Sequence, residues 1–221
     1  QEKLFFSLLG KEMTEEELID IFPVAKAELD GHDVENKVLK IELNDTNRPD
    51  LWSPAGVARA LSTYESGEIP YYDFFSTKDE SKDNEGRVII DDESAIGIRD
   101  FSIGFACRGV EVDDDMLKNL IQSQEKLCFN FGRKRKTIAM GIYRSNLINY
   151  PVHYAAVDPD KTKFVPLGMD EELSLREICQ KHPKGKEYGY IVSSYDKFPY
   201  LYDDKGETLS FPPVINSARI G

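Results

Sequence analysis

Hydrophobic positions in the first 25 residues repeat with the spacing of an α-helix. Residues 2–10 predict a helix, because their apolar side chains fall on one stripe and Gly10 stands where a helix would end. A second helix is predicted after Thr14, since Thr14 and Glu17 have the spacing of a capping box, and it is expected to end before Pro23. The expected stripes are Leu4, Phe5, Leu8 and Leu9 in the first helix and Leu18, Ile21 and Phe22 in the second.

The period changes to two in residues 37–43, "KVLKIEL", where apolar and charged side chains alternate. This alternation predicts a half-buried strand with Leu39, Ile41 and Leu43 on one face. After "NDTNRPDLW", Ser53 is expected to cap a helix that has Pro54 at its first position and continues through "AGVARALSTY". The first module is therefore predicted as two short helices, a strand, a tight turn and a helix.

Short strands dominate the pattern after residue 87. Strands are predicted at 87–91, 101–107, 137–143, 152–158, 189–194, 200–203 and 208–211, and "DDKG" is expected to join the last two as a hairpin turn. One amphipathic helix is predicted from Asp113 to Gly132, and a shorter one begins at Ser174, which has capping-box spacing to Glu177. The stripe of the longer helix is Leu117, Leu120, Ile121, Leu127, Cys128 and Phe131.

Residues 65–87 lack this periodicity and separate two predicted domains. The stretch "STKDESKDNEG" contains no apolar residue and is typical of an exposed connector. We therefore expect an N-terminal module with its connector at 1–87 and a larger module at 88–221. The predicted fold class is α+β: a small module of helices and strand is followed by a mixed or antiparallel, barrel-like sheet with flanking helices.

Composition indicates a globular chain, since 40% of the residues are hydrophobic and 31% are charged. No apolar run approaches the length of a membrane span and no signal peptide is visible, so no membrane partner is expected. The net charge of −12 is uneven: residues 1–87 hold 10 Lys and Arg against 20 Asp and Glu, and residues 88–221 hold 18 against 20. Because the second part contains the dense basic run Arg133–Lys136, the acidic total does not exclude RNA.

Several kinds of catalytic site have no counterpart in the sequence. The cysteines Cys107, Cys128 and Cys179 show no CxxC spacing, which argues against zinc and favours buried free thiols in a reducing cytosol. No phosphate-binding P-loop and no glycine-flanked nucleophilic serine occurs. The residues alone therefore predict no ATP-dependent enzyme and no metal site. The three histidines, expected to be surface or strand residues, are His32, His153 and His182.

Two stretches carry candidate chemistry. The run Arg133, Lys134, Arg135, Lys136 follows a helix-ending glycine and either neutralises phosphates or forms a solvated loop. In "LSFPPVINS", residues 209–217, two prolines interrupt a strand pattern just before Asn216. Asn216 either binds a ligand in an apolar pocket through its amide group or is a structural turn residue. The residues by themselves leave both pairs of alternatives open.

An ordered series of motifs resembles the β chain of phenylalanyl-tRNA synthetases of the archaeal and eukaryotic kind. The stretch "LNDTNRPDLWSPAGVARAL" resembles the turn and helix of that family's N-terminal module. Five further stretches resemble successive motifs of the family's editing module and occur in the same order. They are "IQSQEKL", "GRKRKTIAMGI", "KFVPLG", "HPKGKEY" and "LSFPPVIN". The match covers nearly the whole chain, and the sequence is expected to stop within the editing module.

The resemblance implies an N-terminal part of the β subunit of phenylalanine–tRNA ligase, with an editing module that hydrolyses mischarged Tyr-tRNA(Phe). Whole enzymes of that family are cytoplasmic α2β2 assemblies that join phenylalanine to tRNA(Phe) with ATP and Mg²⁺. Aminoacylation belongs to the α chain, so no cofactor is expected in this part. The implied partners are the α chain and tRNA(Phe).

By the same resemblance, Leu201, Ser210 and Asn216 match positions that line the editing pocket. Ser210 and Asn216 are the expected catalytic residues, which position substrate or water, and Leu201 is expected to pack against the aromatic ring of the substrate. The expected RNA-binding residues are Arg133, Lys134, Arg135 and Lys136, which would guide the acceptor end of the tRNA.

The chain also departs from the family pattern near this expected pocket. It has "GIYR" in place of "GIHD", at Tyr143 and Arg144, and "INSA" in place of "INGE", at Ser217 and Ala218. Two alternative functions therefore remain beside editing. One is a non-catalytic tRNA-docking or scaffold part of the same enzyme, and the other is a free-standing aminoacyl-tRNA deacylase.

Overall fold

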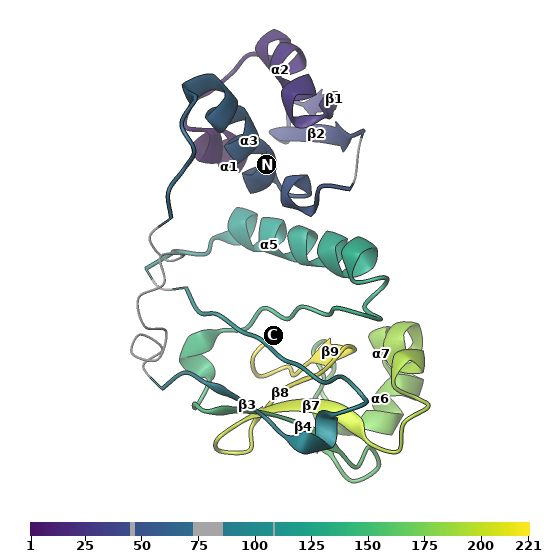
Figure 1. Ribbon diagram of the computed structural model, residues 1–221. Helices are drawn as coiled ribbons and strands as arrows, with labels where there is room; N and C mark the ends of the chain where they lie inside the picture. The colour runs from purple at the N-terminus through teal and green to yellow at the C-terminus, as the bar shows by residue number, and fades with distance from the viewer. Residues whose placement is uncertain (45–46, 73–85, 108) are drawn as a thin grey trace. The chain divides into compact units, whose positions relative to one another are not determined.

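The computed structural model describes residues 1–44, 47–72, 86–107 and 109–221. These residues form two compact units (Figure 1). Unit 1 consists of residues 1–76 and 110–131, and unit 2 consists of residues 77–109 and 132–221. Most of the predicted polar connector lies outside the described residues, and the domain boundary near residue 87 stays a prediction.

Unit 1 contains the helices and the strand predicted for the N-terminal module, and also the long helix that the sequence places in the module at 88–221. Its helices are α1 (Glu2–Leu9), α2 (Glu15–Ile21), α3 (Pro54–Ser66) and α5 (Asp114–Lys126), with short helices η1 (Phe22–Ala25) and η2 (Pro49–Leu51) and a π-helix, η5 (Leu127–Phe131). The strand β2 (Val38–Leu43) pairs antiparallel with β1 (Ala27–Asp33), which the sequence pattern did not reveal.

The predicted helix ends of unit 1 are confirmed. Thr14 accepts a hydrogen bond from the backbone N–H of Glu17, whose carboxylate accepts one in return from the N–H of Thr14. Ser53 caps α3 in the predicted place, through the N–H of Gly56. Gly10 follows α1 with φ of 86°, in the left-handed region that glycine tolerates.

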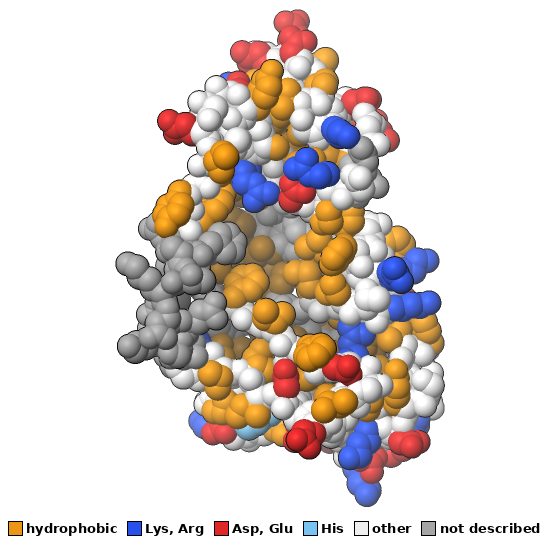
Figure 2. Space-filling view, viewed as in Figure 1, with side chains coloured by type: hydrophobic (Ala, Val, Ile, Leu, Met, Phe, Trp, Pro, Cys, Tyr) orange, Lys and Arg blue, Asp and Glu red, His pale blue; other side chains and the backbone are white. Residues whose placement is uncertain are grey.

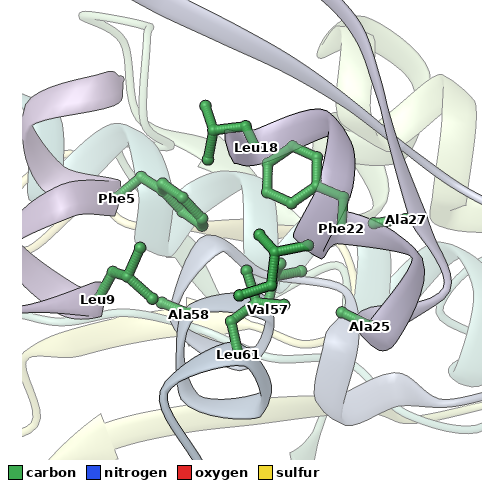
Figure 3. Packing of buried hydrophobic residues seen from close by; sticks show 10 residues of the cluster. Phe5, Leu9, Leu18, Phe22, Ala25, Ala27, Val57, Ala58 and Leu61 are labelled. Carbon is green, nitrogen blue, oxygen red and sulfur yellow. The ribbon is translucent and has the colours of Figure 1, made fainter. Parts of the chain in front are cut away.

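The core of unit 1 forms where the apolar stripes of α1, α2 and α3 meet (Figure 3). Phe5 and Phe22 pack edge to face with ring centroids 5.9 Å apart. Burying each large apolar side chain of this kind contributes about 1.5–3 kcal/mol. The buried members are Phe5, Leu9, Leu18, Ile21, Phe22, Ala25, Ala27, Val57, Ala58 and Leu61.

Unit 2 is built on a five-stranded mixed sheet with the order β3-β4-β7-β8-β9 (Figure 1). β3 and β4 run parallel, whereas the pairs β4–β7, β7–β8 and β8–β9 are antiparallel. The predicted hairpin at "DDKG" joins β7 to β8, and the predicted α+β fold with a mixed sheet is confirmed. The strands are β3 (Ile89–Asp91), β4 (Val152–Val157), β7 (Phe198–Asp203), β8 (Thr208–Phe211) and β9 (Ile215–Asn216).

One face of this sheet packs against helix α6 (Leu175–Lys181). Phe198, Tyr200 and Phe211 share a buried cluster with Leu175 and Ile178 of that helix. Ser174 caps α6 and forms the predicted box with Glu177, whose pKa falls to about 2 because the backbone N–H of Ser174 and then the Lys181 ammonium favour the carboxylate. The remaining elements of unit 2 are η4 (Glu93–Ala95), η6 (Ser145–Leu147), β5 (Lys163–Phe164), β6 (Leu173–Ser174), α7 (Pro183–Tyr188) and η7 (Gly189–Ile191).

The other face of the sheet carries a second buried cluster. Tyr154 of β4 and Leu201 of β7 lie in it, with Leu209 of β8. Tyr143, from the segment before η6, packs against this cluster. Side chains alternate between the two faces of a strand, so β7 supplies Tyr200 to the α6 side and Leu201 to the opposite side.

Three predicted strands are wrong. Residues 101–107 form no strand, and Phe101, Ile103 and Phe105 are 88%, 97% and 92% exposed. Residues 137–143 also lack strand pairing, and residues 189–191 form the short helix η7 instead. Alternating sequence makes a strand only where a neighbouring strand accepts and donates its hydrogen bonds, and for residues 101–107 the described structure supplies none.

Two predictions of burial are also wrong. Leu117, Ile121 and Phe131, on the predicted stripe of the long helix, are exposed, and many hydrophobic side chains appear on the surface (Figure 2). Cys107 is exposed rather than buried, whereas Cys128 is buried and Cys179 is partly buried. Helical spacing shows which side of a helix is apolar, but whether another element covers that side depends on the tertiary structure.

Among the described residues, no helix is long and apolar enough to cross a membrane. The same residues contain no cluster of three or more His, Cys, Asp or Glu side chains with the geometry for a metal ion.

Candidate functional site

Leu201, Ser210 and Asn216 lie in one row across three neighbouring strands. Leu201 of β7 pairs with Ser210 of β8, and Ser210 pairs with Asn216 of β9. Directly paired residues point to the same face of a sheet, with Cβ atoms about 4.5–5.5 Å apart. The structure therefore brings together the three residues that the sequence assigned to a pocket, and we call them the sheet row.

Tyr143 covers the middle of the sheet row. Its hydroxyl is 2.9 Å from Oγ of Ser210, a residue that is only 2% exposed. Burial raises the pKa of Tyr143, and the hydrogen bond with Ser210 only partly offsets that effect. The phenol is therefore neutral at physiological pH and can either donate to or accept from the serine hydroxyl.

Asn216 contacts the residue before this tyrosine. Its side-chain Nδ2 donates a long hydrogen bond of 3.4 Å to the carbonyl oxygen of Ile142. The backbone of Asn216 is held independently, since its carbonyl accepts from the N–H of Leu167 at 2.9 Å. The amide side chain is thus weakly bound on a well-anchored strand, which suits a group that exchanges one hydrogen-bond partner for another.

The double proline separates β8 from β9, as the sequence indicated. β8 ends at Phe211 and β9 begins at Ile215, and the Pro212–Pro213 peptide bond is cis. The short connection folds β9 back beside β8 in antiparallel register. Because proline lacks an N–H and cannot continue the sheet ladder, the pair ends the strand and places Asn216 opposite Ser210.

Arg135 holds this connection in place. Its Nη1 donates to the carbonyl oxygens of Pro213 and Val214, each at 3.1 Å. Its guanidinium also stacks on the ring of Tyr188, 4.2 Å from the centroid. Arg135 is therefore engaged inside unit 2 through these contacts, and RNA binding by Arg135 stays a prediction.

The basic run forms a left-handed turn. Arg133, Lys134 and Arg135 have φ of 48°, 56° and 65°, a conformation that costs about 1–2 kcal/mol per residue for L-amino acids. Hydrogen bonds from Arg99 Nη1 to the carbonyls of Arg135 and Lys136, both 3.2 Å, hold the turn from one side. Strain of this kind persists where surrounding contacts over-determine the backbone.

Exposed cations and an exposed tyrosine lie around this turn. Arg133, Lys134 and Lys136 are exposed, and Lys136 Nζ lies 5.6 Å from the ring centroid of Tyr190. Tyr190 is itself exposed. Cations beside an exposed ring can contact the phosphates and stack on the bases of a single-stranded nucleic acid. RNA binding by these residues stays a prediction.

The histidines are held by structural contacts. His182 is buried at the start of α7, where Nδ1 accepts from the N–H of Lys184 and Nε2 lies 3.0 Å from the carbonyl oxygen of Leu167. His32 and His153 lie on strands β1 and β4, beside Glu2 and Asp204 respectively.

Burial raises the pKa of the Cys179 thiol to about 11, which makes it a poor nucleophile at neutral pH.

Of the positions that depart from the family pattern, Tyr143 contacts the sheet row, through Ser210. Ser217 is buried and donates to the carbonyl of Thr208 at 2.7 Å, so it is bound to the start of β8. Sequence reasoning identifies Tyr143 only as a departure. The signal that could have singled it out is its chemical type, because it carries the same 4-hydroxyphenyl group as the expected substrate.

Comparison with known proteins identifies the relatives of this chain. No family model matches it. The phenylalanine–tRNA ligase beta subunit of Borreliella burgdorferi strain ZS7 is 52% identical over 218 residues, which are 99% of this chain and 38% of that protein. The chain is a relative of phenylalanine–tRNA ligase beta subunits. The resemblance found in its motifs is thereby confirmed.

Further relatives of the same kind agree. The phenylalanine–tRNA ligase beta subunit of Borrelia duttonii strain Ly is 51% identical over 213 residues, which are 96% of this chain and 37% of that protein. The crystal structure of an N-terminal fragment of the phenylalanyl-tRNA synthetase beta-subunit from Pyrococcus horikoshii matches with a TM-score of 0.87 and 36% identity. The match covers 100% of this chain and 62% of the Pyrococcus horikoshii fragment. The chain thus spans less than half the length of the curated beta subunits that it matches.

Proposed function

We propose that this chain is the N-terminal part of a phenylalanine–tRNA ligase beta subunit and that it carries an editing site, which hydrolyses tyrosine from mischarged tRNA(Phe). The observation that carries the proposal is the sheet row, in which Leu201, Ser210 and Asn216 share one face of the sheet in direct register. The similarity to beta subunits over 99% of the chain supports it.

The chemistry of the row fits selection for tyrosine. Tyrosine differs from phenylalanine by one hydroxyl group, and an apolar pocket rejects an added hydroxyl only weakly, by roughly a factor of 10² in related enzymes. A second site that hydrogen-bonds this hydroxyl selects the error instead, because phenylalanine would leave buried polar groups without partners. Ser210 is the buried polar group of this row, and Leu201 supplies apolar contact for an aromatic ring.

Hydrolysis at such a site does not require a strong nucleophile. The ester that links an amino acid to tRNA is already activated, so a positioned water and a donor for the developing oxyanion are sufficient. We assign the positioning of water or substrate to the amide of Asn216, with Ser210 beside it. The terminal ribose hydroxyl of the tRNA, next to the ester, would assist the same water.

The remaining roles belong to the whole enzyme. We infer that an α chain supplies the ATP- and Mg²⁺-dependent joining of phenylalanine to tRNA(Phe), that the two kinds of chain assemble as α2β2, and that the enzyme acts in the cytoplasm. The supporting observation is the similarity to proteins named as ligase beta subunits, a name that implies at least one further kind of subunit.

The test is deacylation of Tyr-tRNA(Phe) by the full natural protein carrying Ser210→Ala or Asn216→Ala, with Phe-tRNA(Phe) as the second substrate. Each variant is expected to lose about tenfold or more in the rate of tyrosine release. Asn216→Ala removes a positioning donor, a change that costs about 10²–10³ in known cases, and Ser210→Ala removes the hydrogen bond to the tyrosine hydroxyl. Ser145→Ala and Asn146→Ala, at exposed positions in η6, are the matched controls. Unchanged rates in both row variants, with folding intact, would reject the editing site.

A docking role without hydrolysis is the second candidate, and one observation favours it. The exposed cations Arg133, Lys134 and Lys136 and the exposed ring of Tyr190 form a surface suited to single-stranded RNA, independently of the sheet row. Under this function the full natural protein would bind tRNA(Phe), but neither row variant would alter the release of tyrosine.

A further inference from the structure

We propose that Tyr143 is an internal occupant of the tyrosine subsite: its side chain fills the place on the sheet row that the tyrosine of a mischarged tRNA takes, and the two exclude each other. This inference rests on the proposed function. It adds a residue that controls access to the site, and it names the 4-hydroxyphenyl group as the ligand that the site accepts.

The first argument is chemical identity. The phenol of Tyr143 lies 2.9 Å from Oγ of Ser210, and its ring packs against the cluster that contains Leu201. These are the two contacts that the proposed function assigns to the hydroxyl and the ring of the substrate. A tyrosine side chain of the protein itself therefore shows that the row can contact and hydrogen-bond a partly buried 4-hydroxyphenyl group.

The second argument is that one short segment engages both polar residues of the row. Tyr143 bonds Ser210, and the carbonyl of the preceding Ile142 accepts from Asn216 Nδ2 at 3.4 Å. A substrate that uses Ser210 and Asn216 must displace residues 142–143 from both. Residues 139–143 belong to no helix or strand of the described structure, so this displacement breaks no ladder of backbone hydrogen bonds.

The third argument is the fit of the tyrosine against Gly141. A Cβ atom at position 141 would lie 2.2 Å from the Tyr143 hydroxyl oxygen and 2.5 Å from the ring carbon that bears it, so the ring lies where only glycine leaves room. The atoms in the way belong to a side chain that can rotate, and not to backbone. A single methyl group at position 141 therefore evicts the ring and leaves Tyr143, Ser210 and Asn216 unchanged in identity.

Internal occupancy has a definite consequence for affinity. A ligand that binds only when the subsite is open has an apparent dissociation constant equal to the intrinsic one divided by the fraction of open molecules. The affinities for tyrosine and for phenylalanine fall by the same factor, so Ser210 still determines the selectivity between them. Occupancy by Tyr143 thus limits entry of both amino acids without changing which one the site prefers.

The experiment measures binding of L-tyrosine and L-phenylalanine to the full natural protein by calorimetry. Gly141→Ala and Tyr143→Ala are expected to bind L-tyrosine roughly 2- to 10-fold more tightly than wild type, which corresponds to a hydrogen bond that the ligand no longer has to replace. The ratio of the two affinities is expected to stay constant in both variants and to fall toward one when Ser210→Ala is added. Gly31→Ala is the matched control, since a Cβ there meets only the Lys40 side chain at 3.7 Å.

Equal or weaker binding of L-tyrosine in Gly141→Ala and Tyr143→Ala, with intact melting curves, would overturn the inference. If Tyr143→Ala does not fold, Tyr143→Phe replaces it, because this variant keeps the ring, removes only the hydroxyl and is expected to show a smaller gain. Deacylation by the full natural protein separates the two proposals. Loss of activity in Asn216→Ala without tighter binding in either variant removes the inference alone, whereas tighter binding without any deacylation removes the proposed function alone.

Discussion

The guanidinium of Arg135 donates a hydrogen bond of 3.1 Å to the carbonyl oxygen of Pro213. The bond joins residues 78 positions apart in the sequence. Through it, Arg135 of the basic run holds the connection between β8 and β9, which leads to Asn216. A stretch that looks in sequence like a patch of interchangeable positive charges therefore contains one residue with a distinct structural role.

Arg135→Ala is expected to destabilise unit 2 by about 1.5–3 kcal/mol, because two backbone carbonyls lose a charged donor and Tyr188 loses its stacked cation. Arg135→Lys should restore little of this, since a lysine cannot reproduce the planar guanidinium. Urea unfolding measures the change. Arg133→Ala at an exposed position is the control, and an equal loss there would show that Arg135 has no special role.

Removal of the exposed cations is expected to weaken RNA binding without unfolding the protein. The triple variant Arg133→Gln, Lys134→Gln, Lys136→Gln should lower affinity for tRNA(Phe) and reduce the slope of log K against log salt by about 2, given roughly 0.7 per phosphate contact on single strands. Filter binding over a salt series measures both. A control triple at exposed Lys3, Lys163 and Lys197 should leave the slope unchanged, and an equal effect there would contradict a specific surface.

Leu201 and Leu209 allow packing to be separated from ligand contact. Both are buried in the same cluster, but only Leu201 belongs to the sheet row. Replacement of either by alanine should cost about 2–5 kcal/mol of stability. Only Leu201→Ala is expected to slow tyrosine release beyond what its stability loss explains, as measured well below the melting temperature. Equal slowing in Leu209→Ala would argue that the row has no direct contact with the substrate ring.

Asp203 should contribute to acid sensitivity. Burial alone would raise its pKa, but hydrogen bonds from Asn149 and from the backbone N–H groups of Glu207 and Lys205 outweigh burial and leave the pKa below its ordinary value. Because the folded pKa lies below the unfolded value of about 3.9, the stabilisation is present above that pH and is lost as the pH falls through the folded pKa.

Asp203→Asn is therefore expected to be less stable than wild type at pH 7, by about 1–3 kcal/mol for a broken buried hydrogen-bond network, and the gap should narrow below pH 4. Unfolding by urea at a series of pH values measures it. The exposed Asp196→Asn should follow the wild type throughout. A gap of constant size from pH 7 to pH 3 would contradict the assignment.

The sequence by itself determined the features that depend on neighbouring residues. Both capping boxes, at Thr14 with Glu17 and at Ser174 with Glu177, were predictable because the four residues that form each one are consecutive. The end of β8 at the double proline was predictable for the same reason, since a missing N–H is a property of the residue itself. The ordered motifs also identified the beta-subunit relatives correctly.

Only the tertiary structure decided which of these features meet. Residues 101–107 alternate as a strand should, but strand formation needs a partner that the described structure does not provide. The basic run looks in sequence like one surface, yet Arg135 turns inward because the carbonyls of Pro213 and Val214 lie within reach. Tyr143 meets Ser210 across 67 positions of sequence, and no local pattern encodes a contact between segments so far apart.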